Sequence, residues 1–344
     1  MRLKDATFGA VAAVLALVWI VAAVRVWPAI APGPRATTTP RSSSAVEVPR
    51  LTGRLALAAG GDVFLLQDGR MSPVATGGGR RDPALAPDGS RVAYSVQTSI
   101  DGKRLTQDGQ VVPAHLDYAS VATRSTTGGV EEVLVNGLQR RDPNGLHVVE
   151  FETQPAWSPD GSQIAFISDG GGGADLQILS LATKRIATLS QGSVLEDPSW
   201  SPDGKTVAVT TYSAGSPGVL LVPADGKAAR KLEIAHNGDA YRASYSPDGR
   251  WLLVTLRTDR GNDLVAVELA TDRAVDLTMD GKSWAGVFSP DGSSVAFLRE
   301  HQGQIDLFVL DVGKTLGAGA APKDAQQITR DGRLDGTARP SWSH

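Results

Sequence analysis

Histidine and acidic side chains are the groups in this sequence that could carry acid–base or metal chemistry. The chain has five histidines and no cysteine, so disulfides, thiolate metal sites and a cysteine nucleophile are excluded. The histidines are widely separated and form no H-x-H or H-E-x-x-H pattern. They are His115, His147, His236, His301 and His344. We therefore expect no metal site and no bound cofactor.

Other chemical motifs are equally sparse. The sequence contains no G-x-S-x-G nucleophile elbow and no G-x-x-x-x-G-K-[ST] phosphate loop. The glycine-rich residues 169–175 lie between two strand-like runs with no helix after them, which favours a flexible hairpin over a phosphate site. Glu131 and Glu132 are adjacent on a strand-like run, so their side chains point to opposite faces and cannot act together. The sequence favours a protein that is not an enzyme.

The composition is that of a globular, strand-rich protein. The 344 residues are 21% charged and 41% hydrophobic, with a formal net charge of −3. A nucleic-acid binder would usually carry a basic surface, so we expect no nucleic-acid partner. The 38 glycines and 20 prolines separate short apolar runs after residue 50, which is typical of many strands and turns.

The N-terminal region is organised differently. Residues 1–5 form a short basic tail, and residues 6–24 are uncharged and mostly apolar. As a helix, such a run spans about 28 Å, close to the hydrocarbon thickness of a bilayer. With Trp27 as an interfacial aromatic, we expect a single-pass signal anchor over residues 6–27. A cleavable signal peptide is the alternative, and Pro32 directly after the candidate cleavage residues Ala29 and Ala31 disfavours it.

Residues 28–50 are rich in proline, serine and threonine and indicate a linker. A basic tip, an apolar run and then a polar chain follow the order of a secretory signal. Arg2 and Lys4 before the run nearly balance Arg25 and Arg35 after it, so charge alone does not set the orientation. We expect residues 51–344 on the extracytoplasmic (periplasmic) side of the cell membrane.

One seven-residue phrase recurs five times. Its copies are ALAPDGS, AWSPDGS, SWSPDGK, SYSPDGR and VFSPDGS, with prolines at Pro87, Pro159, Pro202, Pro247 and Pro290. The successive intervals are 72, 43, 45 and 43 residues. A period in the forties, with four short strand-like runs per unit, is typical of WD40-like propeller blades.

The P-D-G residues of each copy predict a tight turn between strands. Proline presets φ for the turn, aspartate tolerates the next position, and glycine takes the left-handed conformation that returns the chain. One aspartate per turn cannot build a calcium shell, so we interpret these residues as structural. They are Asp88, Gly89, Asp160, Gly161, Asp203, Gly204, Asp248, Gly249, Asp291 and Gly292. We expect the aromatic residue two positions before the proline to wedge between neighbouring blades.

The copies predict an all-β, six-bladed propeller over residues 51–344. The segment before Pro87 supplies three strands of a blade, and the C-terminal PSWSH supplies the missing innermost strand. Such a closure removes the exposed edges that an open array would leave.

The pattern P-x-W-S-P-D-G-x-x-hydrophobic-A-hydrophobic resembles the repeat of the six-bladed TolB propeller family. The resemblance covers nearly all of residues 51–344, with five copies in register. It implies a protein-binding role in assembly of the cell envelope. In TolB a further domain precedes the propeller, whereas in this chain an apolar run and a linker stand before it, and this puts the transfer of TolB's own role in doubt.

Aligning the copies places a polar ring at the mouth of the central funnel, on the face opposite the P-D-G turns. Convergent polar groups of this kind suit a peptide or small ligand, although a solvated rim would also contain them. The candidate binding residues are Arg81, Asp82, Gln154, Glu196, Asp197, Tyr241, Arg242, Trp284 and Arg339.

The long first interval contains about 28 extra residues, which fall near residues 98–114 and 138–152. We expect both insertions to project on the funnel-mouth face, with the Arg140–Pro143 sequence RRDP adding charge there. Because the first blade begins with its second strand, the linker should enter from the opposite face. The funnel would then point away from the membrane.

The favoured function is a membrane-tethered extracytoplasmic scaffold or binding module, whose funnel face holds a protein or peptide partner. An accessory subunit of a larger integral membrane complex is the first alternative. A hydrolase or lyase that uses Asp82, Asp197 or a bound divalent ion in the funnel is the second, less favoured one.

Overall fold

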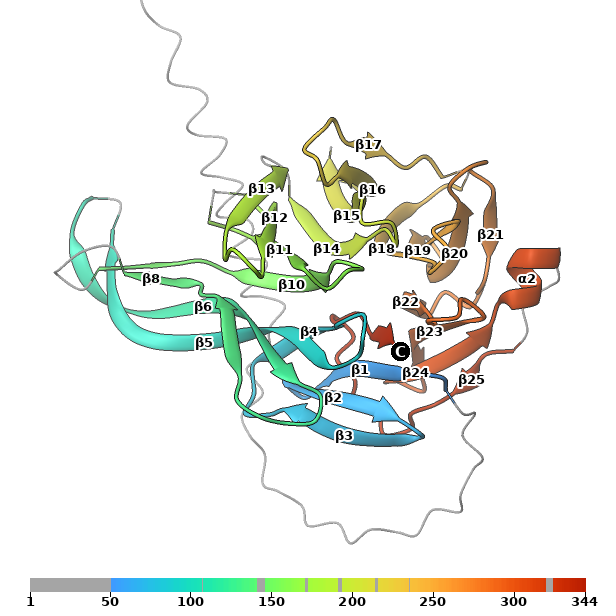
Figure 1. Ribbon diagram of the computed structural model, residues 1–344, viewed down its shortest axis with the longest axis horizontal. Helices are drawn as coiled ribbons and strands as arrows, with labels where there is room; N and C mark the ends of the chain where they lie inside the picture. The colour runs from blue at the N-terminus through green and yellow to red at the C-terminus, as the bar shows by residue number, and fades with distance from the viewer. Residues whose placement is uncertain are drawn as a thin grey trace, which may run out of the picture. The chain divides into compact units, whose positions relative to one another are not determined.

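Six four-stranded antiparallel sheets surround a common axis (Figure 1). The computed structural model describes residues 51–106, 108–140, 146–170, 173–190, 194–213, 216–234, 236–319 and 324–344. The expected all-β, six-bladed propeller is therefore confirmed. The expected tail, anchor and linker of residues 1–50 lie outside the described residues. Within the described part of the chain, no helix has the length and apolar character needed to cross a membrane.

The blades follow one another in chain order, and each consists of four strands from the axis outward. Blade one contains, in that order, β26 (Ser341–Ser343), β1 (Arg54–Ala59), β2 (Asp62–Gln67) and β3 (Arg70–Ala75). Blade two contains β4 (Arg80–Leu85), β5 (Arg91–Leu105), β6 (Val111–Ser125) and β7 (Glu132–Val135). Blade three contains β10 (Glu152–Trp157), β11 (Gln163–Ser168), β12 (Asp175–Ser180) and β13 (Ile186–Ser190).

The other three blades have the same order. Blade four contains β14 (Leu195–Trp200), β15 (Thr206–Ser213), β16 (Ser216–Pro223) and β17 (Arg230–Lys231). Blade five contains β18 (Asp239–Tyr245), β19 (Trp251–Thr258), β20 (Gly261–Glu268) and β21 (Ala274–Asp276). Blade six contains β22 (Ser283–Phe288), β23 (Ser294–His301), β24 (Gln304–Asp311) and β25 (Gln326–Gln327). A short helix, α2 (Gly313–Ala318), follows β24.

The C-terminal strand closes the ring, as the sequence predicts. β26 pairs antiparallel with β1, and Trp342 lies opposite Leu55. The indole of Trp342 also donates to the carbonyl oxygen of Thr52 (2.8 Å). Because these residues are nearly 300 positions apart, the first blade cannot be complete until the whole chain has been made.

The hydrophobic core is divided among the interfaces between blades. Six buried clusters are found among the described residues, and each joins side chains of two adjacent blades. One of them joins blade six to blade one through residues such as Leu298 and Leu57. The smallest, between blades two and three, contains Val121, Val135, Phe166 and Leu179. Each blade is therefore held by contacts on both of its faces, and the ring is continuous.

The repeated turn has one hydrogen-bond pattern in four of its five copies. In the copy of blade five, the Ser246 hydroxyl donates to Asp248 (2.5 Å) and accepts the amide of Trp251 (2.9 Å). The other serines that act in this way are Ser158, Ser201 and Ser289. The first copy has Ala86 at this position, and there the amide and hydroxyl of Ser90 donate to Asp88 Oδ1.

The turns also contact one another around the ring. Gly204 has a φ of +70° and lies against Pro159 of the preceding copy, where a Cβ atom would come within 3.5 Å. The wedging aromatics make comparable links: the indole of Trp157 donates to the carbonyl of Ala84 (3.1 Å), and that of Trp200 to the carbonyl of Ala156 (3.2 Å). The second and third copies thus bind the innermost strand of the blade before them.

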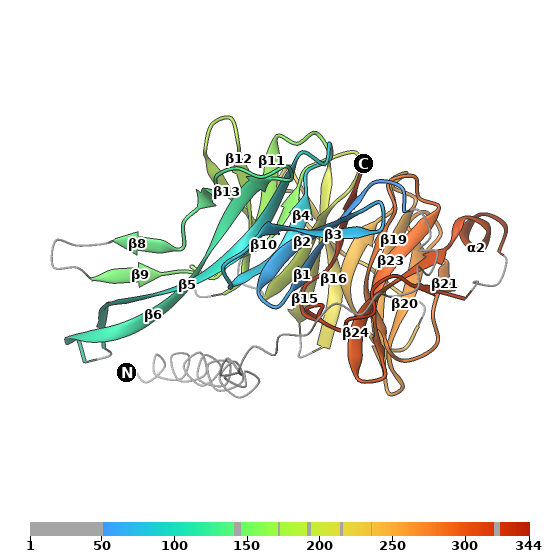
Figure 2. The same ribbon diagram turned by 90° about the horizontal axis from the view of Figure 1, so that it is seen from below.

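Blade two carries a long projection, which we call the arm. It consists of the outer halves of β5 and β6 together with the hairpin of β8 (Leu138–Arg140) and β9 (His147–Val149). Figures 1 and 2 show it leaving the propeller sideways and away from the C-terminus. The two insertions therefore lie where the sequence places them, although they extend outward from the rim. Residues 141–143 of the RRDP sequence lie outside the described residues.

The repeated serine allows a test of the turn. Ser246→Ala should lower the free energy of unfolding by about 1–2 kcal/mol, because it removes two hydrogen bonds at a buried position. Ala86→Ser, which supplies the serine that the first copy lacks, should not lower it. Urea unfolding of both variants checks this, and equal stabilities for wild type and Ser246→Ala would contradict it.

Candidate functional site

Five innermost strands share an unusual backbone feature at the funnel mouth. Each has a residue with φ between 50° and 56°, a left-handed conformation that is uncommon outside glycine. The pairing with the next strand shifts register at the same point, which is a β-bulge. These residues are Asp82, Gln154, Asp197, Arg242 and Ala285. They are the five positions that the sequence alignment places at the mouth, together with Arg339.

The bulge turns a backbone amide toward the preceding blade. The amide of Arg242 donates to Thr210 Oγ1 (2.9 Å), and that of Ala285 donates to Thr255 Oγ1 (3.0 Å). In the same way, the amide of Gln154 binds Ser95 Oγ (3.0 Å). Between blades three and four, Gln154 itself provides the acceptor, because its Oε1 binds the amide of Asp197 (2.7 Å). Hydrogen bonds therefore tie four of the five positions to the preceding blade, whereas Asp82 accepts a bond from Ser95 of its own blade.

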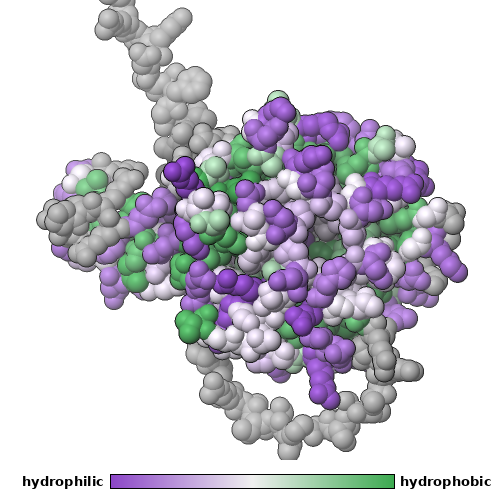
Figure 3. Space-filling view, in the orientation of Figure 1, coloured by the Kyte–Doolittle hydropathy of each residue, from purple (hydrophilic) through white to green (hydrophobic). Residues whose placement is uncertain are grey.

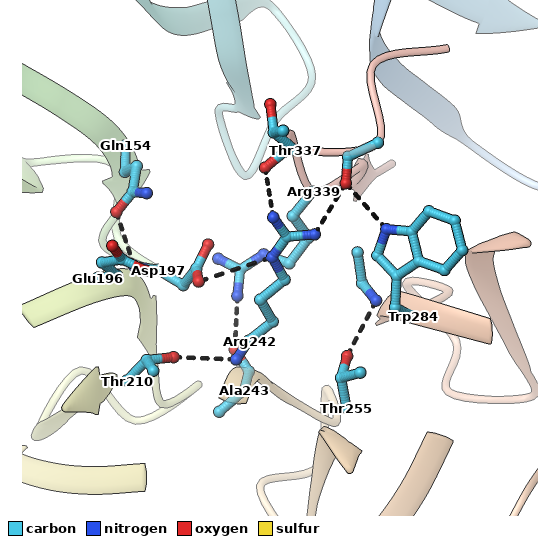
Figure 4. Close-up of polar contacts among 12 residues, drawn as sticks. Gln154, Glu196, Asp197, Thr210, Arg242, Ala243, Thr255, Trp284, Thr337 and Arg339 are labelled. Carbon is cyan, nitrogen blue, oxygen red and sulfur yellow. Dashed lines mark hydrogen bonds and ion pairs between the residues drawn. The ribbon is translucent and has the colours of Figure 1, made fainter. Parts of the chain in front are cut away.

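Arg339 crosses the channel. Its guanidinium donates to the carbonyl oxygens of Ala243 (2.5 Å) and Pro198 (2.8 Å). Figure 4 shows it pointing toward Asp197 and Arg242. Together with Asp82, it borders a constriction of about 20 Å³, which leaves room for about one water molecule. The channel is nearly blocked at this level.

Burial and neighbouring charges perturb the ionisable groups around the constriction. Burial lowers the pKa of Arg339, and the negative charges of Asp197 and Asp82 oppose this effect. Burial raises the pKa of Asp82, against the effects of Arg81 and of a hydrogen bond from Ser95 (2.8 Å). Burial also raises the pKa of Glu196, and the charge of Asp197 adds to the rise. Charged groups of both signs share a poorly hydrated space.

A loop covers the mouth of the funnel. This loop, which we call the strap, comprises residues 335–338 between β25 and β26. Arg242 donates to the carbonyl oxygens of Gly336 (3.1 Å) and Thr337 (2.6 Å), and the Trp284 indole donates to that of Gly336 (2.9 Å). Arg81 forms an ion pair with Asp335 (3.6 Å) and a hydrogen bond to Thr337. These contacts are drawn in part in Figure 4.

The open end of the channel is on the other face. A cavity of about 460 Å³ lies inside the ring of P-D-G turns, and Arg339 is among the residues that line it. We call this cavity the cup. Serine hydroxyls, prolines and the edges of the wedging aromatics line the wall, including Ser199, Trp200 and Tyr245. Figure 3 shows apolar and polar groups interspersed over the surface rather than one broad apolar face.

The structure thus brings together most of the residues expected at the mouth. Their side chains contact one another and the strap. Arg81, Arg242 and Trp284 hold the strap, and Arg339 blocks the channel. Glu196 accepts a hydrogen bond from Tyr212 (3.0 Å), and the ring of Tyr241 lies 5.9 Å from the guanidinium carbon of Arg242. Asp197 forms an ion pair with Arg242 (3.7 Å), with both side chains at most 15% exposed.

Three features of the site were not predicted from the sequence. The buried acceptors Ser95, Thr210 and Thr255 lie on second strands, and their recurrence as small hydroxyl residues was an available signal. The strap lies in a stretch without a repeat motif, so the sequence offered no guide to its position. The cup lies on the face that the alignment assigned to structural turns.

The other candidate motifs of the sequence do not come together in one site among the described residues. Glu131 binds Arg80 and Tyr94, whereas Glu132 binds Arg91, so the two carboxylates act separately. The described parts of residues 169–175 connect β11 to β12 without a helix, as expected for a hairpin. Among the residues that the structure describes, no group of three or more His, Asp or Glu side chains is arranged to hold a metal ion.

The fold is a six-bladed β-propeller, and comparisons with known proteins show a similarity to TolB propellers over part of the chain. The family model described as the TolB beta propeller domain matches residues 117–279, which extend from β6 to just beyond β21. A curated protein, the TolB homolog of Chlorobium luteolum, is 31% identical over 159 residues. That match covers 46% of this chain and 26% of the relative, about a quarter of its length.

Solved structures agree on the fold. TolB from Acinetobacter baumannii superposes with a TM-score of 0.61 at 16% identity, covering 86% of this chain and 68% of that one. A TolB candidate from Agrobacterium tumefaciens gives 0.60 at 17% identity, covering 85% of this chain and 94% of that one. Such identities establish the fold alone. The TolB-like propeller expected from the repeat is confirmed by these matches together with the family model.

The strap contacts lead to a prediction. Arg242→Ala should lower the free energy of unfolding by about 2 kcal/mol, because it removes charged hydrogen bonds to Gly336 and Thr337. Backbone amides of the strap should exchange faster with solvent. The control is Arg257→Ala, which loses a half-exposed pair with Asp239 and should cost less than about 1 kcal/mol. Unchanged exchange of the strap in Arg242→Ala would contradict its role.

Proposed function

We propose that this protein is a membrane-tethered, extracytoplasmic binding module whose channel holds a segment of a partner protein. The single observation that supports this most directly is the cup, an axial cavity of about 460 Å³ with Arg339 in its lining. A cavity of this volume, lined by both apolar and polar groups, suits several side chains of an extended segment. The TolB likeness supports a role at the cell envelope, and the apolar run of residues 6–24 supports the tether.

The constriction determines how a segment would bind. Because Arg339 and the strap obstruct the far end, a partner would insert a chain end or a loop from the turn face rather than thread through the propeller. Backbone carbonyl groups of the segment that have no other hydrogen-bond partner would face the serine hydroxyls in the wall of the cup. The mouth ring, which the sequence favours for binding, is a second candidate surface, and a partner there would contact the exposed side of the strap.

The two other functions remain as alternatives with different expectations. An accessory subunit would co-purify with integral membrane proteins in detergent at fixed stoichiometry. A funnel enzyme would need Asp82 or Asp197 free to react, but Asp82 accepts a hydrogen bond from Ser95 and Asp197 pairs with Arg242. These contacts favour binding over catalysis at the mouth.

Site-specific photocrosslinking in native membranes distinguishes a partner bound in the cup from one bound at the mouth. A photoreactive amino acid at Ser199 reports on the cup, and one at Thr337 reports on the mouth. We expect a discrete protein adduct from position 199 and none from position 337. Adducts from position 337 alone would place the partner at the mouth and contradict binding in the cup.

A substitution provides the matching affinity measurement. Ser199→Arg fills the cup and should reduce recovery of the crosslinked partner at least tenfold, which corresponds to about 1.4 kcal/mol. Ser216→Arg, at an exposed position outside the channel, is the control and should leave recovery unchanged. Undiminished recovery with a folded Ser199→Arg protein would contradict the proposed function.

A further inference from the structure

A group of carboxyl groups lies where the arm joins blade three. Glu150 precedes β10, Glu152 begins it, Asp169 follows β11 and Asp175 begins β12. Among the described residues, no lysine or arginine forms an ion pair with Glu150, Glu152 or Asp169. Within the part of the chain that the structure describes, these three acidic groups therefore meet without a basic side chain to neutralise them.

Glu152 is the buried member of the group. Its side chain is nearly inaccessible, with 3% of the residue exposed. It pairs in register with Ser168, which pairs in turn with Asp175, so these three side chains lie on one face of blade three. The Ser168 hydroxyl donates to Glu152 Oε1 (3.2 Å), whereas the buried Oε2 has no hydrogen-bond partner. A buried carboxylate oxygen without a donor is costly, and this one needs either a proton or a ligand.

Glu150 connects this face to the arm. Its Oε2 accepts a hydrogen bond from Gln139 Nε2 of β8 (2.8 Å), and its backbone binds Gly137 and Ala119. Its carboxylate lies over Gly170, where a Cβ atom would come within 2.7 Å of Glu150 Cδ. Asp169 Oδ1 accepts the amide of Phe151 (2.6 Å) between the two glutamates. The segment that anchors the β8–β9 hairpin is thus packed against the acidic face.

The neighbouring negative charges favour the protonated, neutral form of the buried Glu152 side chain. Burial and the negative charges of Glu150 and Asp169 raise the pKa of Glu152 to about 8, and the hydrogen bond from Ser168 offsets only part of this rise. Burial raises the pKa of Asp169 as well. A neutral Glu152 has a hydroxyl donor, whereas an ionised Glu150 has only acceptors. These two groups can therefore share one proton. On the side of β6, Ala119 lies opposite Phe151.

We propose that a proton held between Glu152 and Glu150 locks the β8–β9 hairpin onto blade three, and that loss of this proton loosens the base of the arm. Neutral and acidic conditions keep the hairpin in place. At alkaline pH two adjacent carboxylates repel each other, and the buried oxygen of Glu152 carries a charge without a donor. The lock is independent of any ligand in the channel.

The direction of the pH effect follows from the two states of Glu152. The usual pKa of this side chain is 4.5, and the folded protein retains the proton up to a pH of about 8. Between these values the folded state binds more protons than the unfolded state, so stability falls as pH rises through this range. Between pH 4.5 and about 8, each unit should therefore increase opening of the hairpin about tenfold, and above about 8 the opening levels off because both states have lost the proton.

Hydrogen exchange measured by mass spectrometry on the full-length protein tests the lock. We compare peptides covering residues 138–140 and 146–152 at pH 6 and pH 9, both with EDTA and corrected for intrinsic exchange. Wild type should lose protection about a hundredfold between pH 6 and pH 9, whereas peptides from β19 should not change. Glu152→Gln, which keeps a permanent donor, should remain protected at both pH values. Equal protection of wild type at both pH values would overturn the proposal.

A second variant keeps the test decisive if Glu152→Gln does not fold. Glu150→Gln removes a neighbouring charge that helps to raise the pKa of Glu152, so the loss of protection should be smaller and should level off at a lower pH. An unchanged pH dependence in Glu150→Gln would contradict the shared proton. Calcium is the remaining probe: if EDTA abolishes protection at pH 6 and added calcium restores it, a cation rather than a proton occupies the site and the proposal is wrong.

Discussion

The pairing of β26 with β1 is the interaction on which the rest of the structure depends. It joins the two ends of the propeller without a covalent bond, and it supplies the innermost strand of blade one. Without it, β1 would present an unpaired edge at the axis, and the clusters that blade one shares with blades six and two would lose part of their cover. The C-terminal segment also contributes the strap, Arg339 and part of the cup wall. Closure of the ring and formation of the channel are therefore one event.

The repeat and its exceptions have different physical roles. The turns, the wedging aromatics and the inter-blade clusters recur because each blade must meet its neighbours in the same way. The channel residues differ from blade to blade, and they form contacts that cross the axis, such as Arg339 with Pro198 and Ala243. The arm is the largest departure from the repeat, and a group of carboxyl groups rather than an apolar cluster lies at its base. The departures from the repeat are therefore concentrated at the channel and at the arm, where the propeller could bind a partner.

Most of the fold could be predicted from the sequence because its determinants are local and repeated. The S-P-D-G turns fix the spacing of the blades, and the terminal PSWSH shows how the ring closes. The two insertions could also be located, because they interrupt a constant period. The candidate site could be predicted only in part. The mouth residues are the ones that alignment indicates, but their partners come from segments without a motif, such as Gly336 and Thr337 for Arg242. Contacts between such distant positions leave no periodic signal, and neither does the buried carboxyl group of Glu152.

The most direct measurement of the central claim is thermal unfolding of a protein that lacks residues 340–344. Removing β26 should abolish the closing pairs with β1, lower the unfolding temperature by more than about 10 °C and increase amide exchange in β1 and β2 before the other blades. A truncated protein that melts at the same temperature as the intact chain, with unchanged exchange in blade one, would contradict closure of the ring by the C-terminal strand.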